Sequence, residues 1–418
     1  MIMAMKRIQN KILICGLFVA MLSIGFSMVS CSNDDLGESI FDTNDYPLNK
    51  NEYTFPLDSF CKANFQEPYN MRFLYQMQDI SSDMDYNLVP CTYDQSVTLA
   101  VLCKYLWYDV YHDSIDNGLQ FLKKYSPRII HVIGSPAYNP ASGTEVLGLA
   151  EGGMKISLYN ANAISVDDID FMNEYFFKTM HHEFSHILNQ NVNRPTDFDL
   201  ISNGKYNAED WGDTQDSIAL GRGFISPYAS SQAREDWVEV IANYIVKDTM
   251  TWNNMLNTAS FEWEYVEDVD LNYWNSLNAK VYFGTADRDS VGYKVGNNGD
   301  IAFILRKAIQ RDADNKYAVT DASGEIVYKH SSGVNGRQVI LQKLEMVKAW
   351  LKENFNYDLE KVRMGVQRKQ WLTDENGDFI FDSKGRFINK FTYVRPDGTK
   401  LIDELRQQVL RFEDLRQK

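Results

Sequence analysis

His182-Glu183-Phe184-Ser185-His186 is the most informative segment of this 418-residue chain. Residues four apart lie on one face of an α-helix, so the imidazoles of His182 and His186 can bind the same Zn²⁺ ion. Glu183 is close enough to act on a water molecule at the metal without binding the metal itself. The alternative is a solvated helical face with two unrelated histidines, although six histidines would produce this match by chance in roughly one sequence in a hundred. The spacing therefore predicts a zinc site on a helix.

The sequence before this motif predicts where its helix begins. Ser165 and Asp168 have the S-x-x-D spacing of a helix N-terminus. The apolar residues that follow recur at helical spacing, and they are Ile169, Met172, Phe176, Phe177 and Met180. We expect this helix to continue to about residue 190. His181 projects about 100° away from His182 on such a helix, so we expect it to pack in the core or to support a neighbouring side chain.

A catalytic zinc site needs a third protein ligand, with the fourth position left for water. The Gly and the third His of the longer motif H-E-x-x-H-x-x-G-x-x-H are absent, so we expect a carboxylate. Glu235 and Glu239 lie four residues apart on the otherwise apolar segment Ala233–Val246, which is predicted to be helical. Unpaired carboxylates would be costly there. We expect one of them to bind the metal and the other to support a ligand, with Asp236 as a further candidate ligand.

The first thirty residues have the order of a secretory signal peptide. Lys6, Arg7 and Lys11 precede an apolar run over 12–29, and the run stops at Met28-Val29-Ser30-Cys31. This segment resembles a bacterial lipobox, in which the cysteine is lipidated, so we expect Cys31 to become the mature N-terminus. Plain cleavage or a retained membrane anchor is the alternative. The polar, acidic residues 31–52 are expected to form a tether, and residues 32–38 within it resemble the export signal of surface lipoproteins in Bacteroidota.

The composition excludes two classes of protein. The chain is 44% hydrophobic and 24% charged, which is ordinary for a folded protein and excludes a disordered one. The formal charge of −15 would repel a phosphate backbone, so nucleic acid is not expected as a partner. Besides Cys31, the mature chain has three cysteines, Cys61, Cys91 and Cys103. They allow one disulfide at most, or they are small core residues.

The remaining sequence indicates an α+β organisation. Residues 128–134 and 154–159 are predicted strands, and residues 191–230 read as a loop. The chain from about 250 onward reads as mainly helical, including 336–354 and 398–416, with a hairpin near 370–395. After the signal peptide 1–30 and the tether 31–52, we expect a catalytic domain over 53–255. A mainly helical C-terminal region, 256–418, is expected to pack on it.

The two motifs together resemble gluzincins of the anthrax lethal factor type. Those enzymes carry H-E-x-x-H followed about fifty residues later by E-x-x-A-E, which a Tyr precedes. Here Glu235 follows His186 by 49 residues and Tyr228 precedes Glu235 by seven, while Val238 replaces the Ala. With its lipobox, the chain is similar to the zinc-binding metallopeptidase lipoproteins of Bacteroidota, also called substrate import-associated zinc metallohydrolases. The resemblance implies a zincin-like fold with a small mixed sheet over the active-site helix.

The resemblance also implies roles for individual residues. It makes His182, His186 and Glu235 the zinc ligands, and it leaves Glu239 to support one of them. Glu183 would be the general base and Tyr228 would stabilise the oxyanion. The strand 154–159 would be the sheet edge that pairs with an extended peptide substrate.

The implied activity is zinc-dependent hydrolysis of peptide bonds in a peptide or protein substrate. The expected location is the outer membrane, through lipid on Cys31, with the protein surface-exposed and linked to a TonB-dependent import system. The alternative function is a substrate-binding lipoprotein of such a system, with a structural or vestigial zinc site. Glu183 argues against this alternative, because a purely structural site has no use for an acid beside the metal. A further alternative keeps the hydrolase and changes the bond to an amide in cell-wall or glycoprotein material.

Overall fold

The computed structural model describes part of the chain. The described residues are 48–77, 87–138, 145–146, 148–151, 154–265, 290–294, 301–310, 313, 319–325, 327–329 and 333–416. The chain divides after Pro47, and all of these residues belong to the unit Leu48–Lys418. The predicted signal peptide, Cys31 and most of the tether lie outside the described residues. Within the described part, none of the helices has the length and apolar character needed to cross a membrane.

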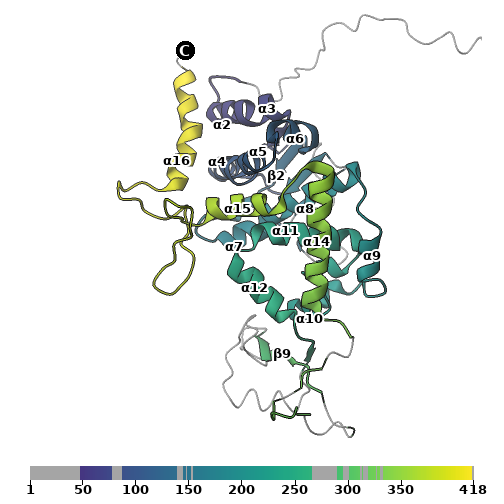
Figure 1. Ribbon diagram of the computed structural model, residues 1–418. Helices are drawn as coiled ribbons and strands as arrows, with labels where there is room; N and C mark the ends of the chain where they lie inside the picture. Colours follow the sequence, from purple (N-terminus) through teal and green to yellow (C-terminus); the bar gives the residue numbers. More distant parts are fainter. Residues whose placement is uncertain are drawn as a thin grey trace, which may run out of the picture. The chain divides into compact units, whose positions relative to one another are not determined.

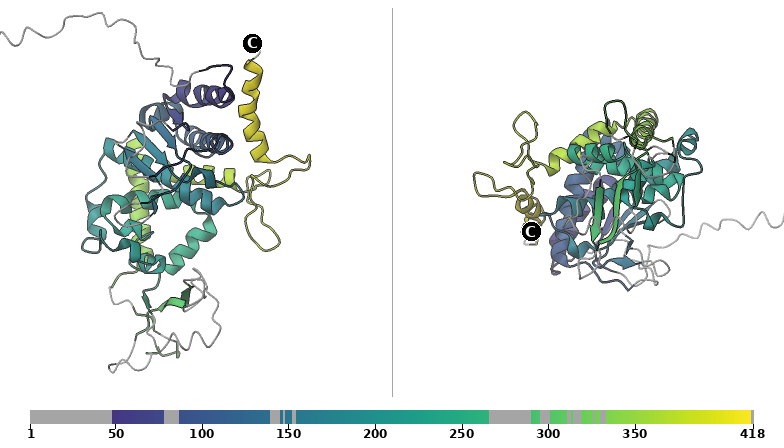
Figure 2. Two further views of the ribbon diagram at one scale, coloured as in Figure 1. Left: turned by 180° about the vertical axis from the view of Figure 1, so that it is seen from behind. Right: turned by 90° about the horizontal axis from the view of Figure 1, so that it is seen from below.

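Helices make up most of the described unit (Figures 1 and 2). The α-helices are α2 (Phe55–Cys61), α3 (Glu67–Tyr69), α4 (Tyr93–Leu102), α5 (Asp109–Ser114), α6 (Gly118–Tyr125), α7 (Ile169–Met172), α8 (Lys178–Asn191), α9 (Asp197–Ile201), α10 (Asp216–Gly221), α11 (Ala233–Val246), α12 (Thr249–Thr258), α14 (Gly336–Phe355), α15 (Leu359–Gln370) and α16 (Leu401–Leu410). Short π-helices are η2 (Lys62–Gln66), η3 (Cys103–Tyr108) and η5 (Asn173–Phe177). Short 3-10 helices are η4 (Ala161–Ala163), η6 (Trp211–Asp213), η7 (Tyr228–Ser230) and η8 (Arg411–Leu415).

A small mixed sheet lies beside the helix that carries the H-E-x-x-H motif, as predicted. Its order is β1 (Arg72–Leu74), β2 (Ile129–Val132), β6 (Lys155–Leu158) and β5 (Gly148–Glu151). The first three strands are parallel, and β5 is antiparallel to β6. Helix α8, which carries the H-E-x-x-H motif, contacts both β5 and β6. The α+β fold class is therefore confirmed.

The edge of this sheet differs from the prediction. The segment 154–159 was expected to be the edge strand, but β6 lies between β2 and β5, and β5 is last in the order. The connection from Glu151 to Lys155 is too short for the crossover that a parallel pair needs. Strands β5 and β6 are therefore antiparallel, and β5 forms hydrogen bonds with the edge of β6 that was expected to be free for substrate.

The helix that carries the H-E-x-x-H motif is continuous from Ile169 to Asn191, through α7, η5 and α8. Its N-cap is Asp168, whose carboxylate accepts a hydrogen bond from the Phe171 amide at 2.8 Å. Ser165 does not cap the helix and instead accepts a hydrogen bond from the Asp167 amide in the preceding turn. The S-x-x-D spacing therefore predicts the start of the helix correctly, but the aspartate rather than the serine is its N-cap. The predicted end near residue 190 is confirmed.

Helix α11 packs against α8 and has the predicted bounds Ala233–Val246 (Figure 1). Every residue of α11 from Glu235 to Val246 is buried, because α8, α14 and α15 all contact it. Trp237, Val238, Ile241 and Ile245 supply apolar contacts in this core. A helix buried on all sides holds its polar side chains in fixed positions, which is what a metal site requires.

The C-terminal helices complete this core rather than standing apart from it. The last carbonyls of a helix have no partner within the helix and need outside donors. In α11 they are satisfied by α15, where Gln367 Nε2 donates to Ile245 O at 2.9 Å and to Val246 O at 3.1 Å, and Arg363 Nη1 donates to Tyr244 O. The predicted boundary between residues 255 and 256 stays a prediction about folding units.

The described residues between 250 and 330 are less helical than predicted. After α12, the strands β7 (Trp263–Tyr265), β9 (Ile301–Lys307) and β8 (Ser290–Lys294) form an antiparallel sheet in the order β7-β9-β8. A separate two-stranded sheet joins β3 (Ala137–Tyr138) to β4 (Glu145–Val146). In the segment predicted as a hairpin, bridges join Trp371 to Asn389, Thr373 to Phe379 and Phe381 to Phe387. The turns inside these bridges need Gly377 and Gly385, which have positive φ.

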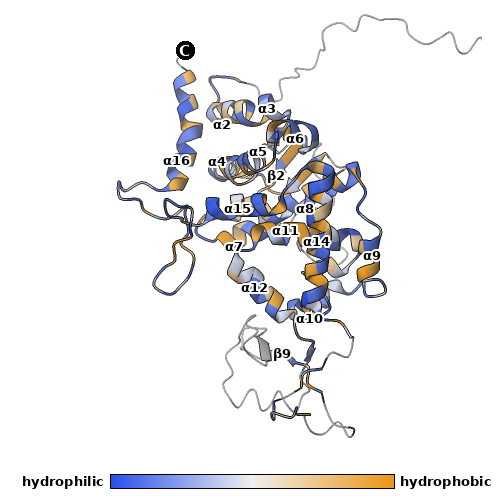
Figure 3. Cartoon of the chain, viewed as in Figure 1, coloured by the Kyte–Doolittle hydropathy of each residue, from blue (hydrophilic) through white to orange (hydrophobic). Residues whose placement is uncertain are grey.

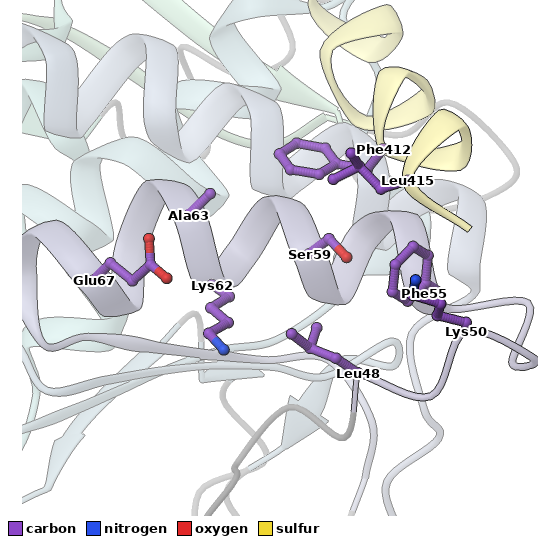
Figure 4. Close-up of a pocket in the computed structure, with 9 residues that line it drawn as sticks. All are labelled: Leu48, Lys50, Phe55, Ser59, Lys62, Ala63, Glu67, Phe412 and Leu415. Carbon is purple, nitrogen blue, oxygen red and sulfur yellow. The ribbon is translucent and has the colours of Figure 1, made fainter. Parts of the chain in front are cut away.

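The last helix, α16, packs on the N-terminal helices. Figure 3 shows it as mainly hydrophilic, and four of its apolar residues, Leu401, Ile402, Leu405 and Val409, are buried where it packs on α2 and α4. A groove of about 440 Å³ lies beside α2, with Phe412 and Leu415 of η8 among its lining residues (Figure 4). Cys61, Cys91 and Cys103 are all free and buried, so these three form no disulfide and act as core residues.

Candidate metal centre

Three side chains bring one potential ligand atom each to the same point. His182, His186 and Glu235 offer atoms that all lie within 4.8 Å of one another. Glu235 Oε2 is 3.2 Å from His182 Nε2 and 3.1 Å from His186 Nε2. Two ligand atoms bound to a tetrahedral zinc ion at about 2.1 Å would lie about 3.4 Å apart. The observed spacing is therefore close to that of a zinc coordination sphere, and two imidazoles with one carboxylate are ligands that zinc prefers.

The two helices place these atoms by simple geometry. His182 and His186 lie one turn apart on α8, and their ring centroids are 4.9 Å apart. Glu235 is in the first turn of α11, the helix that packs directly on α8. Its second oxygen, Oε1, accepts a hydrogen bond from Arg234 Nε at 2.9 Å. This contact leaves Oε2 facing both imidazoles.

Glu239, one turn after Glu235, holds the other side of His182. A carboxylate only accepts hydrogen bonds, so His182 Nδ1 donates to Glu239 Oε1 at 2.8 Å. This contact leaves the Nε2 lone pair for a metal. Glu239 Oε2 accepts two more hydrogen bonds, from Ser226 Oγ at 2.6 Å and from Asn243 Nδ2 at 3.1 Å.

The two glutamates therefore have different positions, which the sequence left open. Glu235 lies among the three converging groups and Glu239 lies behind His182. Asp236, the other candidate, points away from both and binds Lys343 on α14 at 2.6 Å. The structure brings the predicted ligands together, and it places Asp236 in a structural ion pair.

The electrostatics of the centre suit a cation. Burial opposes the charged form of His182, but its hydrogen bonds to Glu235 and Glu239 outweigh this effect and raise its pKa to about 10. Burial also opposes the charge of Glu239, yet the Lys178 ammonium and the hydrogen bond from His182 hold its pKa well below the usual range. The pKa of Glu235 is also held low, because its hydrogen bonds to both histidines outweigh its burial. Without metal, a proton on His182 therefore balances the carboxylates.

Glu183 faces a different environment from the other two acids. It is 9% exposed, and burial raises its pKa even though His182 and His186 lie near it and favour its charged form. A carboxylate whose pKa is raised above its usual value takes up a proton more readily. Glu183 is therefore suited to accept a proton and to pass it on, while its role as the general base stays a prediction.

Tyr228 lies at the border of the centre. Its ring centroid is 5.8 Å from that of His182, and it packs edge-on against Trp211 with centroids 4.9 Å apart. Burial raises its pKa above the ordinary value, and the Glu235 and Glu183 carboxylates raise it further. The phenol therefore stays protonated and can donate a hydrogen bond. It is 36% exposed, so a substrate can reach it.

Sequence reasoning missed the supporting residues. Asn243 continues the four-residue spacing of Glu235 and Glu239 along α11, so it could have been found from the pattern. Lys178 precedes His182 by the same spacing on α8. Ser226 and Trp211 carry no such signal, because only the path of the loop brings them to the centre. His181 is fully buried and accepts a hydrogen bond from Tyr111 at 2.9 Å, so it supports the core rather than the metal.

The sequence profile of a family described as putative zinc-binding metallo-peptidase matches residues 50–360. The chain is similar to a crystal structure of a putative zinc-binding metallo-peptidase from Bacteroides caccae, with 30% sequence identity and a TM-score of 0.51. That match covers 75% of this chain and 91% of the other. No curated protein matches the chain.

Proposed function

The chain belongs to the family of putative zinc-binding metallopeptidases, and from this premise we propose that it hydrolyses peptide bonds with one zinc ion held by His182, His186 and Glu235. The observation that carries the proposal is the convergence of two Nε2 atoms on one oxygen of Glu235, with Glu183 buried beside them. A centre built only to hold metal would need no such acid.

A zinc ion at this position would polarise the scissile carbonyl and lower the pKa of a water molecule. Glu183 takes a proton from the attacking water and later gives it to the leaving amine, which its raised pKa favours. Tyr228 donates its phenolic hydrogen to the oxygen that develops negative charge. Glu239 holds His182 in one orientation through Nδ1.

The position of the substrate follows from the sheet. Strand β5 is last in the sheet order and contacts the active-site helix α8. An extended peptide can add to the edge of such a strand through backbone hydrogen bonds. The substrate would then run beside β5, which replaces the segment 154–159 in this role.

The location and partners of the protein belong to the same proposal. The signal-like residues 1–30 and the lipobox at Cys31 support attachment to the outer membrane through lipid, with the acidic tether holding the enzyme at the cell surface. Peptides released there would be available to a TonB-dependent importer. Protease treatment of intact cells tests the exposure, and a Cys31→Ala variant that stays on the membrane would contradict anchoring by lipid.

The activity is tested with a peptide library and three preparations: the chain with zinc, the chain after chelation, and the Glu183→Gln variant. We expect cleavage by the first preparation, recovery when zinc returns to the second, and a loss of roughly 10²- to 10⁴-fold for the variant. The variant should still bind one zinc ion per chain. Glu353→Gln, an exposed acid on α14, is the matched control and should cleave normally. Stoichiometric zinc in the native chain with no cleavage of any peptide or glycopeptide would favour a binding protein instead.

A further inference from the structure

We propose that Ser226 is a positioning residue that joins the turn carrying Tyr228 to the metal centre through Glu239. The inference rests on the proposed function and adds to it a residue outside both sequence motifs. Among the described residues, Ser226 is the one whose hydroxyl forms a hydrogen bond with Glu239 and a second hydrogen bond with the turn that carries Tyr228.

The first contact acts on the metal centre. Ser226 Oγ donates to Glu239 Oε2 at 2.6 Å, while the other oxygen of Glu239 accepts from His182 Nδ1 at 2.8 Å. Asn243 Nδ2 also donates to Oε2, at 3.1 Å, and Asn243 lies on α11 with Glu239 itself. Of the two donors to Oε2, Ser226 is therefore the one that comes from outside α11, and it fixes the carboxylate against rotation about its own side chain.

The second contact acts on Tyr228. The Ala229 amide donates to Ser226 Oγ at 3.1 Å, so the same oxygen also begins the 3-10 turn Tyr228–Ser230. The turn is closed at Pro227 O by the Ser230 amide at 2.9 Å and the Ser230 hydroxyl at 2.6 Å. Ala229 is fully buried and anchors the turn in the core. Tyr228 lies between Ser226 and this anchor, so its ring has little freedom to move from His182.

A serine hydroxyl has one hydrogen to donate and lone pairs to accept with, and both contacts use the same oxygen. Accepting from Ala229 leaves the single hydrogen for Glu239. The position of the Tyr228 turn and the orientation of His182 are therefore linked through one atom. Loss of this hydroxyl would leave the Ala229 amide without its partner and the Glu239 carboxylate with one fewer donor.

The change to test is Ser226→Ala. Partners of this kind in other metal sites typically change metal affinity or activity by 10- to 100-fold when removed. We expect zinc affinity, measured by competition with a coloured chelator, to fall by roughly 10-fold. We also expect kcat to fall by more than KM changes, because the Tyr228 hydroxyl acts after the substrate is bound. Ser226→Thr keeps the hydroxyl and should restore most of both losses.

Two further variants separate positioning from a general loss of structure. Ser231→Ala removes a buried hydroxyl from the same loop that has no hydrogen-bond partner among the described residues, and it should leave zinc affinity and kcat unchanged. In a Tyr228→Phe background, Ser226→Ala should reduce kcat much less than it does in the native chain, because the hydroxyl to be positioned is gone.

Zinc affinity gives a readout that does not depend on peptide cleavage, so failure of the proposed peptidase activity would leave this test intact. Unchanged zinc affinity and unchanged kcat in Ser226→Ala would overturn the inference. A drop in thermal stability without a change in zinc affinity or kcat would also overturn it. Equal losses of zinc affinity and kcat in Ser226→Ala and Ser231→Ala would overturn it as well. A loss of kcat that is the same with and without the Tyr228 hydroxyl would contradict the link to Tyr228.

Discussion

At the scale of single residues, the centre depends on two glutamates that the sequence pattern could not tell apart. Glu235 and Glu239 are the same residue type, one helical turn apart and equally buried. The direction of each side chain relative to α8 separates them. Glu235 reaches the Nε2 atoms of both histidines, and Glu239 reaches only Nδ1 of His182.

The first prediction concerns these two residues. Glu235→Gln should abolish tight zinc binding, because the charged oxygen is lost from the coordination sphere. Glu239→Gln should keep the zinc site but lower its affinity for zinc by roughly 10- to 100-fold, because only the interaction that orients His182 is lost. Isothermal titration of the metal-free variants with zinc measures both. Tighter zinc binding by Glu235→Gln than by Glu239→Gln would reverse the two assignments.

The residues proposed to bind the metal and to carry out the chemistry could be predicted because their spacing is local. His182, Glu183 and His186 are related by one turn of helix, and that relation is visible in any helical segment. Ser226 could not be predicted, because its contact with Glu239 depends on where a loop of irregular structure lies. Residues that act through tertiary contacts leave no periodic signal in the sequence.

At the scale of elements, α14 and α15 hold α11 in place. Lys343 of α14 reaches Asp236 of α11 at 2.6 Å, and both side chains are fully buried. The ammonium also donates to Gly223 O at 2.7 Å, and the Tyr206 hydroxyl donates to Asp236 at 3.0 Å. Asp236 is next to Glu235, so this ion pair fixes the segment that carries the proposed ligand.

The second prediction follows from this ion pair. Lys343→Met leaves Asp236 as a buried carboxylate without its cation, which typically lowers the free energy of unfolding by about 3–5 kcal/mol. Urea unfolding of the metal-free chain measures the loss. Lys348→Met on the same helix removes a partly exposed lysine with weak partners, at 3.7 and 3.9 Å, and should change stability by about 1 kcal/mol or less. Equal losses in the two variants would contradict the role of the buried pair.

The third prediction concerns the approach of α14 to α10. A Cβ atom on Gly336 would lie 2.2 Å from Leu220 O and 2.7 Å from Ala259 O, both of which are backbone atoms that cannot move aside easily. Gly336→Ala should therefore destabilise the chain, by about 1–3 kcal/mol as overpacking usually does. Gly212→Ala, where a Cβ would meet nothing within 4 Å, is the control. The same unfolding midpoint for both variants would be inconsistent with this contact.

The helices of the core were predictable and several strands were not. The continuous helix from Ile169 to Asn191 and helix α11 show their own apolar periodicity, so their bounds agree with the prediction within a residue or two. Strands β5 and β7 are only four and three residues long, too short to show a period. Which strand forms the edge depends on pairing with a distant segment, and that pairing is a property of the folded chain rather than of the strand.

At the scale of the whole molecule, the unit Leu48–Lys418 contains a buried histidine that must stay neutral. Burial lowers the pKa of His181 to about 3. Its Nδ1 atom accepts from the Tyr111 hydroxyl at 2.9 Å, and Nε2 has no hydrogen-bond partner among the described residues. A proton on this ring would therefore be a buried charge without an anion beside it.

The fourth prediction is the pH dependence that results. In the unfolded chain His181 takes up a proton near pH 6.5, whereas in the folded chain it does so only near pH 3. The contribution of neutral His181 to the free energy of unfolding is complete above pH 6.5. As the pH falls from 6.5 toward 3, this contribution decreases by up to about 1.4 kcal/mol per pH unit. Unfolding of the metal-free chain between pH 7 and 4 measures this. His181→Gln should show a flatter curve, and parallel curves would rule the histidine out as the cause.

We propose that one zinc ion binds where the two histidines and Glu235 meet. Diffraction from crystals of the zinc-loaded chain, recorded on both sides of the zinc absorption edge, tests it most directly. We expect one anomalous peak per chain, in contact with Nε2 of His182, Nε2 of His186 and a carboxylate oxygen of Glu235. A peak bound by Glu239 in place of Glu235, or the absence of a peak at the histidines with zinc bound elsewhere, would contradict it.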